Sequence, residues 1–326
     1  MRQDLRGLPP FAPAYVHYTG SLARFVQALS KMMTLADIAR ALKMSWETVK
    51  AILKSKLERT YKYIDLKGVR RIAIDEIHIG REMRDGRKRG RFLTLVIDLE
   101  SGRILHVAKG RGANALEKFF RRLRLARVRI EAVSCDMAAG YWSAVLKHLK
   151  TAALVFDRFH IVKLMNERID DIRRGLQREA SALGRSFLKG VRFLLFMRGE
   201  NVPEHRQKQL NQALEFNQPL ATAYYLKERL LALWECPIRS LMEMRLRHWI
   251  EDALATGMPA LVKMAATLRM HEEQILNYAD HPITSGKMEG INNKIKTLNR
   301  SAYGYRDLHF FTLRLYDLHN SGYKLI

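Results

Sequence analysis

The chain has 326 residues, of which 48% are hydrophobic, and it is therefore long enough to bury two or three separate cores. Its two cysteines rule out a disulfide framework and a multi-cysteine zinc module, and the lack of a long apolar run argues against a signal peptide or a membrane span, as expected for a cytoplasmic protein. Lysines and arginines number 57 against 33 acidic residues, a formal net charge of +24 that favours nucleic acid as partner, although a generally basic or ribosome-associated protein would show a similar excess.

Residues 1–65 predict a helix-turn-helix region. Thr34 and Ser45 are suitable N-caps for two helices, because each hydroxyl can accept a hydrogen bond from a first turn and apolar residues follow at helical spacing. A helix from residue 21 to residue 32 would complete a small bundle. Recognition helices contact base edges near their N-terminal end. We therefore expect DNA-binding side chains at three outward positions of the second helix of the pair, namely Trp46, Glu47 and Lys50.

Residues 66–165 alternate strands with helices and would form the first part of a catalytic core. Apolar spacing predicts strands at residues 70–80, 91–102, 103–110, 129–136 and 152–161, and helices at residues 115–125 and 141–149. The first two strands would form a hairpin around the turn at Asp85 and Gly86. An order of three strands, a helix, a strand, a helix and a strand is that of the ribonuclease-H-like core.

Residues 166–279 show helical periodicity, and their length indicates an inserted domain rather than a loop. We expect Trp234 and Trp249 in its core, although one of them could instead stack on a displaced base. Residues 280–326 would return to the catalytic core with the last helices. The predicted fold is therefore α/β: a ribonuclease-H-like mixed sheet with a large inserted all-helical domain and an N-terminal helix-turn-helix.

Two aspartates occupy apolar strands, where a carboxylate is unfavourable unless something binds it. Asp75 lies within the first strand of the core and Asp136 ends the fourth. In this order of elements the first and fourth strands are adjacent, so the two carboxylates can converge. Strand alternation favours Asp75 over Glu76 as the ligand. The alternative is that both acids cap a backbone segment or pair with arginine.

The final helical segment supplies a candidate third acid. Glu289, Asn292 or Asn293, and Lys296 are spaced so that they share one helix face. Such a stripe is poor core material, but it suits a metal ligand flanked by phosphate contacts. Three neighbouring carboxylates repel one another, and a pair of divalent cations would relieve that repulsion.

These motifs resemble those of a known family. Resemblance to the DDE transposases of bacterial insertion sequences, closest to the ISL3 family, covers most of the chain and is carried by the helix-turn-helix and by IAIDEIHIG, SCDMAAGY, FDRFHIVKLMNE and SGKMEGINNKIKTLNRSAYGYRD. It implies that Asp75, Asp136 and Glu289 form a catalytic triad that binds metal. It further implies Mg²⁺ as cofactor, with two ions expected and Mn²⁺ able to substitute, and terminal inverted repeats as substrate. Relatives typically begin with a cysteine-rich zinc-binding module, and this sequence lacks those cysteines. Two interpretations stay open: end recognition rests on the helix-turn-helix alone, or the chain is a short or truncated member of the family.

Further polar residues are candidates for supporting roles. Asp157 and His160 resemble the DRFH motif of the family and, with Asn292, are expected to position the substrate or the metal ligands; alternatively, Asp157 pairs with a neighbouring basic residue. The hairpin turn carries the basic residues Arg87, Lys88 and Arg89. Their side chains are either solvated or in contact with DNA phosphates. Stronger phosphate candidates lie on the last helix beside the expected metal site, at Lys294, Lys296 and Arg300.

We therefore expect a transposase that cleaves a phosphodiester bond at the end of an insertion sequence and joins the freed 3′-hydroxyl to target DNA. Its partner would be double-stranded DNA, as inverted-repeat ends and as target, bound by a homodimer at the bacterial nucleoid. Two alternatives stay open: a catalytically silent DNA-binding regulator derived from a transposase, and a ribonuclease-H-like nuclease or resolvase. The three intact acids argue against the first, and an end-specific helix-turn-helix argues against the second.

Overall fold

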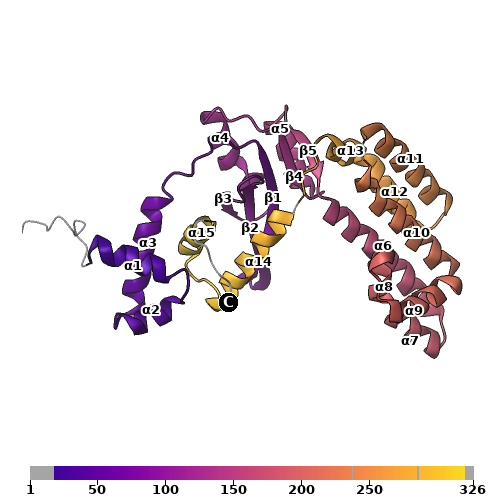
Figure 1. Ribbon diagram of the computed structural model, residues 1–326, viewed down its shortest axis with the longest axis horizontal. Coiled ribbons are helices and arrows are strands. Elements are labelled where there is room, and N and C mark those ends of the chain that lie inside the picture. Colours follow the sequence, from indigo (N-terminus) through magenta and orange to yellow (C-terminus); the bar gives the residue numbers. More distant parts are fainter. Residues whose placement is uncertain (1–17, 237, 285, 320–326) are drawn as a thin grey trace, which may run out of the picture. The chain divides into compact units, whose positions relative to one another are not determined.

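The computed structural model describes residues 18–236, 238–284 and 286–319 and separates into two compact units (Figure 1). The first unit combines residues 1–130 with residues 286–326, and the second consists of residues 131–285. The second unit is therefore inserted in the sequence of the first.

Helices and strands follow one another as the sequence predicts. The first unit contains α1 (Gly20–Leu29), α2 (Leu35–Ala41), α3 (Trp46–Thr60), β1 (Arg71–Arg84), β2 (Arg87–Asp98), β3 (Ile104–Lys109), α4 (Glu117–Leu125), α14 (Gly286–Ser301) and α15 (Leu308–Asp317). The second contains β4 (Ala132–Cys135), α5 (Ala139–His148), β5 (Ala153–Phe156), α6 (Arg158–Glu179), α7 (Ala182–Gly190), α8 (Arg192–Phe196), α9 (Glu204–Glu215), α10 (Gln218–Leu231), α11 (Arg239–Ala255), α12 (Pro259–Met270) and α13 (Glu272–Asp280).

The helix-turn-helix forms from local signals. Thr34 caps α2 in a capping box with Asp37, and Ser45 caps α3 by accepting a hydrogen bond from a backbone amide of the first turn at 3.1 Å. Both predicted caps are confirmed. The bundle of α1, α2 and α3 is completed by α15, which contributes Phe310 and Leu313 to its apolar core. The C-terminal part of the chain therefore stabilises the N-terminal helices.

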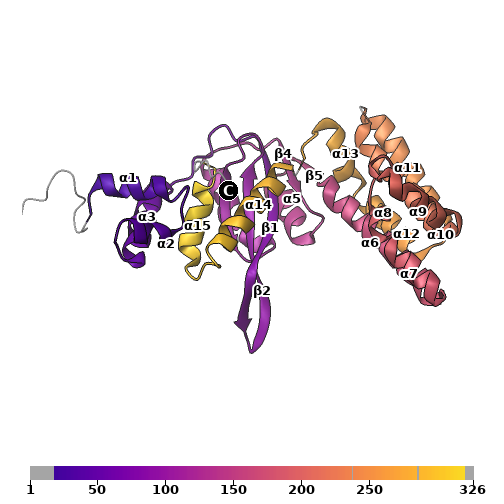
Figure 2. The same ribbon diagram turned by 60° about the horizontal axis from the view of Figure 1, so that its bottom comes forward.

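A long hairpin of β1 and β2 dominates the first unit. Its turn residues, Asp85 and Gly86, have φ angles of 52° and 71°, and two positive φ angles define the type I′ turn that matches strand twist. Pairing therefore continues to Arg84 opposite Arg87. The sequence predicted a wider basic turn here; the structure extends both strands instead, and Figure 2 shows the hairpin reaching past the rest of its unit.

The sheet has five strands in the order β3-β2-β1-β4-β5. Strand β2 pairs antiparallel with both β1 and β3, whereas β4 and β5 are parallel. This is the ribonuclease-H-like arrangement, and the predicted fold class is confirmed. In the first unit, α4 buries Phe119, Phe120 and Leu123, and His106 of β3 stacks on Phe119 with ring centroids 5.7 Å apart.

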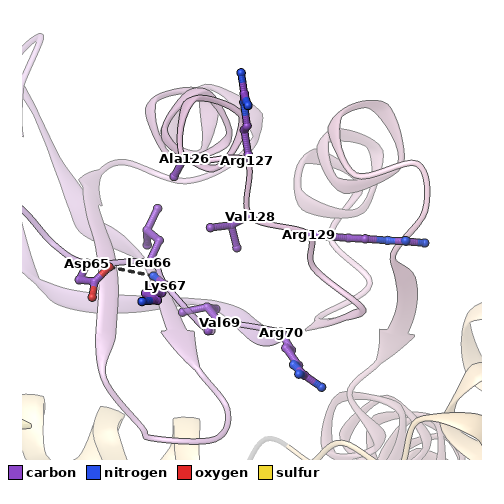
Figure 3. Close-up of a pocket in the computed structure, with 10 residues that line it drawn as sticks. Asp65, Leu66, Lys67, Val69, Arg70, Ala126, Arg127, Val128 and Arg129 are labelled. Atoms are coloured by element: carbon purple, nitrogen blue, oxygen red, sulfur yellow. Dashed lines mark hydrogen bonds between the residues drawn. The ribbon is translucent and has the colours of Figure 1, made fainter.

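The segment between the helix-turn-helix and the sheet is fastened by α4. The guanidinium of Arg122 donates hydrogen bonds to the carbonyl oxygens of Leu105 at 3.1 Å and Ile64 at 2.9 Å. These bonds tie three separate parts of the unit together. They help to hold the turn at residues 65–70 beside the loop at residues 126–129 (Figure 3).

The second unit joins the β4–β5 pair to a body of helices. Helix α13 packs on β5, where the Asn277 side chain donates a hydrogen bond to the carbonyl of Leu154 at 3.0 Å. Trp249 is 1% exposed and its indole N–H donates to the carbonyl of Leu226 at 2.7 Å; Trp234 is 8% exposed. The predicted core positions of both tryptophans are confirmed.

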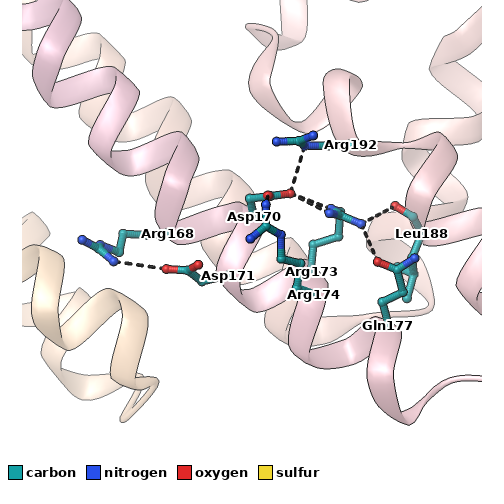
Figure 4. Close-up of polar contacts among 8 residues, drawn as sticks. All are labelled: Arg168, Asp170, Asp171, Arg173, Arg174, Gln177, Leu188 and Arg192. Carbon is teal, nitrogen blue, oxygen red and sulfur yellow. Dashed lines mark hydrogen bonds and ion pairs between the residues drawn. The ribbon is translucent and has the colours of Figure 1, made fainter. Parts of the chain in front are cut away.

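A cluster of charges around the buried carboxylate of Asp170 connects two helices of this unit (Figure 4). The carboxylate of Asp170 on α6 binds the guanidinium groups of Arg173 at 2.7 Å, Arg174 at 2.8 Å and Arg192 at 3.2 Å. Because Arg192 begins α8, the cluster ties α6 to α8. An unpaired buried carboxylate would cost several kcal/mol, so loss of these partners would weaken the body of helices.

The division into compact units differs from the domains drawn on the sequence. β4, α5 and β5 group with the inserted helices, whereas the sequence placed residues 66–165 in one domain. The boundaries at residues 1–65, 66–165, 166–279 and 280–326 stay predictions. Among the described residues, no helix combines the length and the apolar character needed to cross a membrane.

Candidate active site

Asp75 lies in the middle of β1 and joins this strand to α14. Its Oδ1 accepts a hydrogen bond from the backbone N–H of Glu76 at 2.7 Å, and its Oδ2 accepts one from Nδ2 of Asn292 at 2.8 Å. Asp75 and Asn292 are 217 positions apart in the sequence. Two of the predicted site residues are therefore in direct contact within the first unit.

One face of helix α14 packs against the rest of the first unit, and its other faces carry polar residues. Its buried residues recur at helical spacing: Met288, Ile291, Ile295 and Leu298. Asn292 is half-buried, and its Oδ1 is a buried atom without a hydrogen-bond partner among the described residues. Because Nδ2 is committed to Asp75, Oδ1 is an acceptor with unmet capacity, and such atoms are normally satisfied by a cation or water.

Glu289 lies three residues before Asn292, so the two side chains share one side of α14. The Glu289 side chain is exposed, and no described residue forms a hydrogen bond or ion pair with it. The helix that carries the predicted third acid is thus bonded to the strand that carries the first.

A groove of about 480 Å³ runs along β1 and α14 from this contact. It is lined on one side by Glu76, Ile77, His78, Ile79 and Gly80, and on the other by Asn292, Ile295, Lys296, Asn299 and Arg300. Lys296 and Arg300 are exposed and four residues apart, about 6 Å along the helix axis. Asn299 was not identified from the sequence, although its three-residue spacing from Lys296 places both residues on one side of the helix.

The remaining predicted acids lie in the second unit. Asp136 directly follows β4, and its Oδ1 accepts a hydrogen bond from the backbone N–H of Ala138 at 3.1 Å, just before α5. Asp157 is 5% exposed and caps α6 through the backbone N–H of Phe159 at 3.1 Å, while its Oδ2 lies 2.9 Å from Nδ1 of His160. Asp157 and His160 are therefore paired, with His160 in the first turn of α6.

Metal binding at this site depends on the donor atoms that its side chains offer. Among the described residues, no three side chains of His, Cys, Asp or Glu lie together closely enough to hold a metal ion. The chemistry of the donors fits Mg²⁺, however, since the predicted ligands are carboxylates and the buried Oδ1 of Asn292 beside Asp75 is an unpartnered oxygen.

The outward face of α3 differs in part from expectation. Trp46 is 45% exposed and Glu47 is exposed. The ammonium of Lys50, however, lies 3.0 Å from the carboxylate of Asp307, which also binds Lys54 at 3.0 Å. Burial raises the pKa of Asp307, but the hydrogen bonds from the Phe310 backbone and both lysines outweigh it, and the net effect lowers that pKa.

The predicted basic side chains are exposed, but Arg87, Lys88 and Arg89 lie in strand β2 and not in a turn. Arg87, Lys88 and Arg89 are exposed near the end of the β1–β2 hairpin, and Arg89 lies 4.0 Å from the carboxylate of Asp85. Lys294, Lys296 and Arg300 are exposed on α14. Two of these three line the groove, whereas Lys294 lies on another side of the helix.

A helix-turn-helix joined to a ribonuclease-H-like core defines an enzyme that recognises DNA and processes its phosphodiester bonds. The transposase model of the ISL3 family matches residues 72–315, and the helix-turn-helix domain of transposase family ISL3 matches residues 8–55. The chain belongs to the ISL3 family of transposases. The resemblance inferred from its motifs is confirmed.

Two relatives illustrate the similarity. The transposase for insertion sequence element IS1001 of Bordetella parapertussis is 32% identical over 305 residues, covering 92% of this chain and 73% of its own length. The transposase for insertion sequence element IS1557 of Mycobacterium tuberculosis (strain CDC 1551 / Oshkosh) is 29% identical, covering 91% of this chain and 71% of its own. Among solved structures, a Drosophila P element transposase strand transfer complex aligns with a TM-score of 0.47 and 12% identity, covering 95% of this chain and 93% of that one.

Proposed function

We propose that this transposase cleaves DNA at the ends of an insertion sequence and transfers the freed 3′ ends to target DNA, with Asp75, Asp136 and Glu289 as its acidic triad. The observation that carries the proposal is the hydrogen bond from Asn292 to Asp75, which bonds the helix of Glu289 to the strand of Asp75. The names of its relatives, transposases for insertion sequence elements, support this substrate.

The three carboxylates would hold two Mg²⁺ ions, with Oδ1 of Asn292 as a further oxygen beside Asp75. Bound there, the ions would lower the pKa of an attacking water and offset charge on the departing oxygen. The side-chain amide of Asn292 donates a hydrogen bond that holds the Asp75 carboxylate in one rotamer. The carboxylate of Asp157 holds the imidazole ring of His160 through its contact with Nδ1. The Asn292–Asp75 and Asp157–His160 contacts would thereby position Asp75 and His160 for the substrate.

The groove would hold the DNA strand that leads to the scissile phosphate. Lys296 and Arg300 flank it with positive charge, one turn apart, and both are exposed enough to reach phosphate oxygens. Lys294 and the hairpin residues Arg87, Lys88 and Arg89 would contact phosphates outside the groove. These contacts set register and affinity but carry no sequence information.

Recognition of the terminal inverted repeats would fall to the helix-turn-helix, with Trp46 and Glu47 at base edges and Lys50 joining them once DNA competes with Asp307. Joining two ends needs two active sites held together, so the DNA-bound form would be at least a homodimer. In a bacterial cell this activity would be located at the nucleoid in the cytoplasm.

The test is to incubate the purified protein with Mg²⁺ and linear DNA carrying the two flanks of its own gene, and then to map the 3′ ends. The proposal expects new 3′-hydroxyl ends at discrete positions at the edge of the repeats, followed by joined products. Binding without any new ends would support a silent regulator instead. Preferential cutting of branched DNA would support a nuclease or resolvase.

A further inference from the structure

A second concave surface of the first unit lies away from the groove, between the turn at residues 65–70 and the loop at residues 126–129. Its volume is about 530 Å³. Leu66, Val69 and Val128 form its apolar floor. Four cationic side chains line it, Lys67, Arg70, Arg127 and Arg129, against one acid, Asp65.

Three of the four rim cations form no ion pair with another described residue. Among the described residues, Lys67, Arg127 and Arg129 form no ion pair, whereas other exposed arginines do, such as Arg71 with Glu100 at 3.1 Å. The carboxylate of Asp65 accepts a hydrogen bond from the backbone N–H of Lys67 at 2.9 Å, which shapes the turn. The result is a surface with a local excess of positive charge.

Arg127 is held in an unfavourable backbone conformation. Its φ is 51°, and it occupies the position after the end of α4 where the backbone N–H groups of Arg127 and Val128 bond back to Arg124 at 3.2 Å and Leu123 at 3.1 Å. Glycine is the usual residue in this left-handed position, because it carries no Cβ penalty. The same conformation ends α2 at Lys43 and α14 at Tyr303, so the backbone there serves the helix end and glycine should be tolerated at position 127.

The direction of the side chains indicates the ligand. In Figure 3 the side chains of Arg70, Arg127 and Arg129 point away from one another around Val69 and Val128. One small anion could not engage diverging guanidinium groups, whereas a polymer with a row of phosphates can. The bonds of Arg122 to Leu105 and Ile64 keep the two walls in place, so the surface is preformed.

We propose that this surface binds the sugar–phosphate backbone of end DNA outside the bases that α3 reads. The site rests on the proposed function for its ligand and extends it, because the wall at residues 65–70 follows α3 directly and leads into β1. DNA bound there would be held between the helix that is proposed to read its bases, α3, and the strand that carries Asp75, β1. The apolar floor accommodates deoxyribose, and the rim neutralises successive phosphates.

The deciding variant is Arg127→Gly. Glycine relieves the left-handed strain, so thermal stability should stay the same or rise, while DNA affinity falls and the log–log salt slope flattens by about 0.9. The triple variant Lys67→Ala, Arg127→Ala and Arg129→Ala should flatten the slope by about two to three units. A matched control removes three exposed lysines of the second unit, Lys189, Lys208 and Lys263.

Hydroxyl-radical footprinting of the full chain on its end duplex locates the contact. With Arg127→Gly and with the triple variant, the DNA backbone should lose protection over one block of nucleotides. That block should lie outside the positions whose protection depends on Trp46, and the α3 footprint should be retained. Unchanged protection and slope in Arg127→Gly, an equal flattening in the lysine control, or a uniform loss over the whole footprint would each overturn the proposal. Wild-type binding without cleavage would instead count against the proposed function and leave this inference standing.

Discussion

The groove beside Asp75 makes a quantitative prediction about salt dependence. Lys296 and Arg300 line the groove, are exposed, and form no ion pair among the described residues. If each neutralises one phosphate, the double variant Lys296→Ala and Arg300→Ala should flatten the log–log salt slope of binding by about 1.8 units, at about 0.9 per contact. Between about 50 mM and 200 mM salt, wild-type affinity should then fall roughly tenfold more than that of the variant.

The assay is a titration of end-DNA affinity at a series of salt concentrations, with a charge-matched control of Lys208→Ala and Lys263→Ala on the second unit. Adding Lys294→Ala tests the contact predicted outside the groove, and the triple variant should reach a flattening of about two to three units. Equal salt slopes for the groove variant and wild type would show that neither Lys296 nor Arg300 contacts a phosphate.

Three further predictions address recognition, the α15 contact and the helical core. Trp46→Ala with Glu47→Ala should reduce the preference for element ends over random DNA in a competition assay; equal losses on both DNAs would mean that α3 does not read bases. Asp307→Asn should lower thermal stability at neutral pH. Because the folded pKa of Asp307 is lowered from 3.8, this difference from wild type should shrink as pH falls below that value, and a pH-independent difference would contradict the ion pairs. Trp249→Phe should cost roughly 2 kcal/mol in chemical denaturation, since the carbonyl of Leu226 loses its donor; unchanged stability with lost cleavage would argue for a DNA contact.

Local signals predicted much of the fold. Thr34 and Ser45 cap their helices because the hydrogen bonds involved span only three residues, and the hairpin forms at Asp85 and Gly86 because that pair tolerates positive φ. The length of the β1–β2 hairpin was underestimated. A run of charged residues indicates a solvated segment equally well whether it is a loop or a paired strand.

The features that the sequence could not supply depend on distant partners. Lys50 looks outward on α3 alone, but it pairs with Asp307, which only the packing of α15 brings near. The Asn292 contact with Asp75 spans 217 positions. Proximity of Asp136 to the other acids is likewise a matter of tertiary structure and stays a prediction.

The central claim is that three acids form one metal-dependent site. It is tested most directly by Mg²⁺-dependent 3′-end formation on the end duplex with Asp75→Asn, Asp136→Asn and Glu289→Gln, measured beside DNA binding by the same preparations. Each variant should bind the ends like wild type and yield no detectable cleavage, because each change removes a metal ligand and leaves the phosphate contacts in place. Cleavage near the wild-type rate by any one of the three would contradict the account and remove that residue from the site.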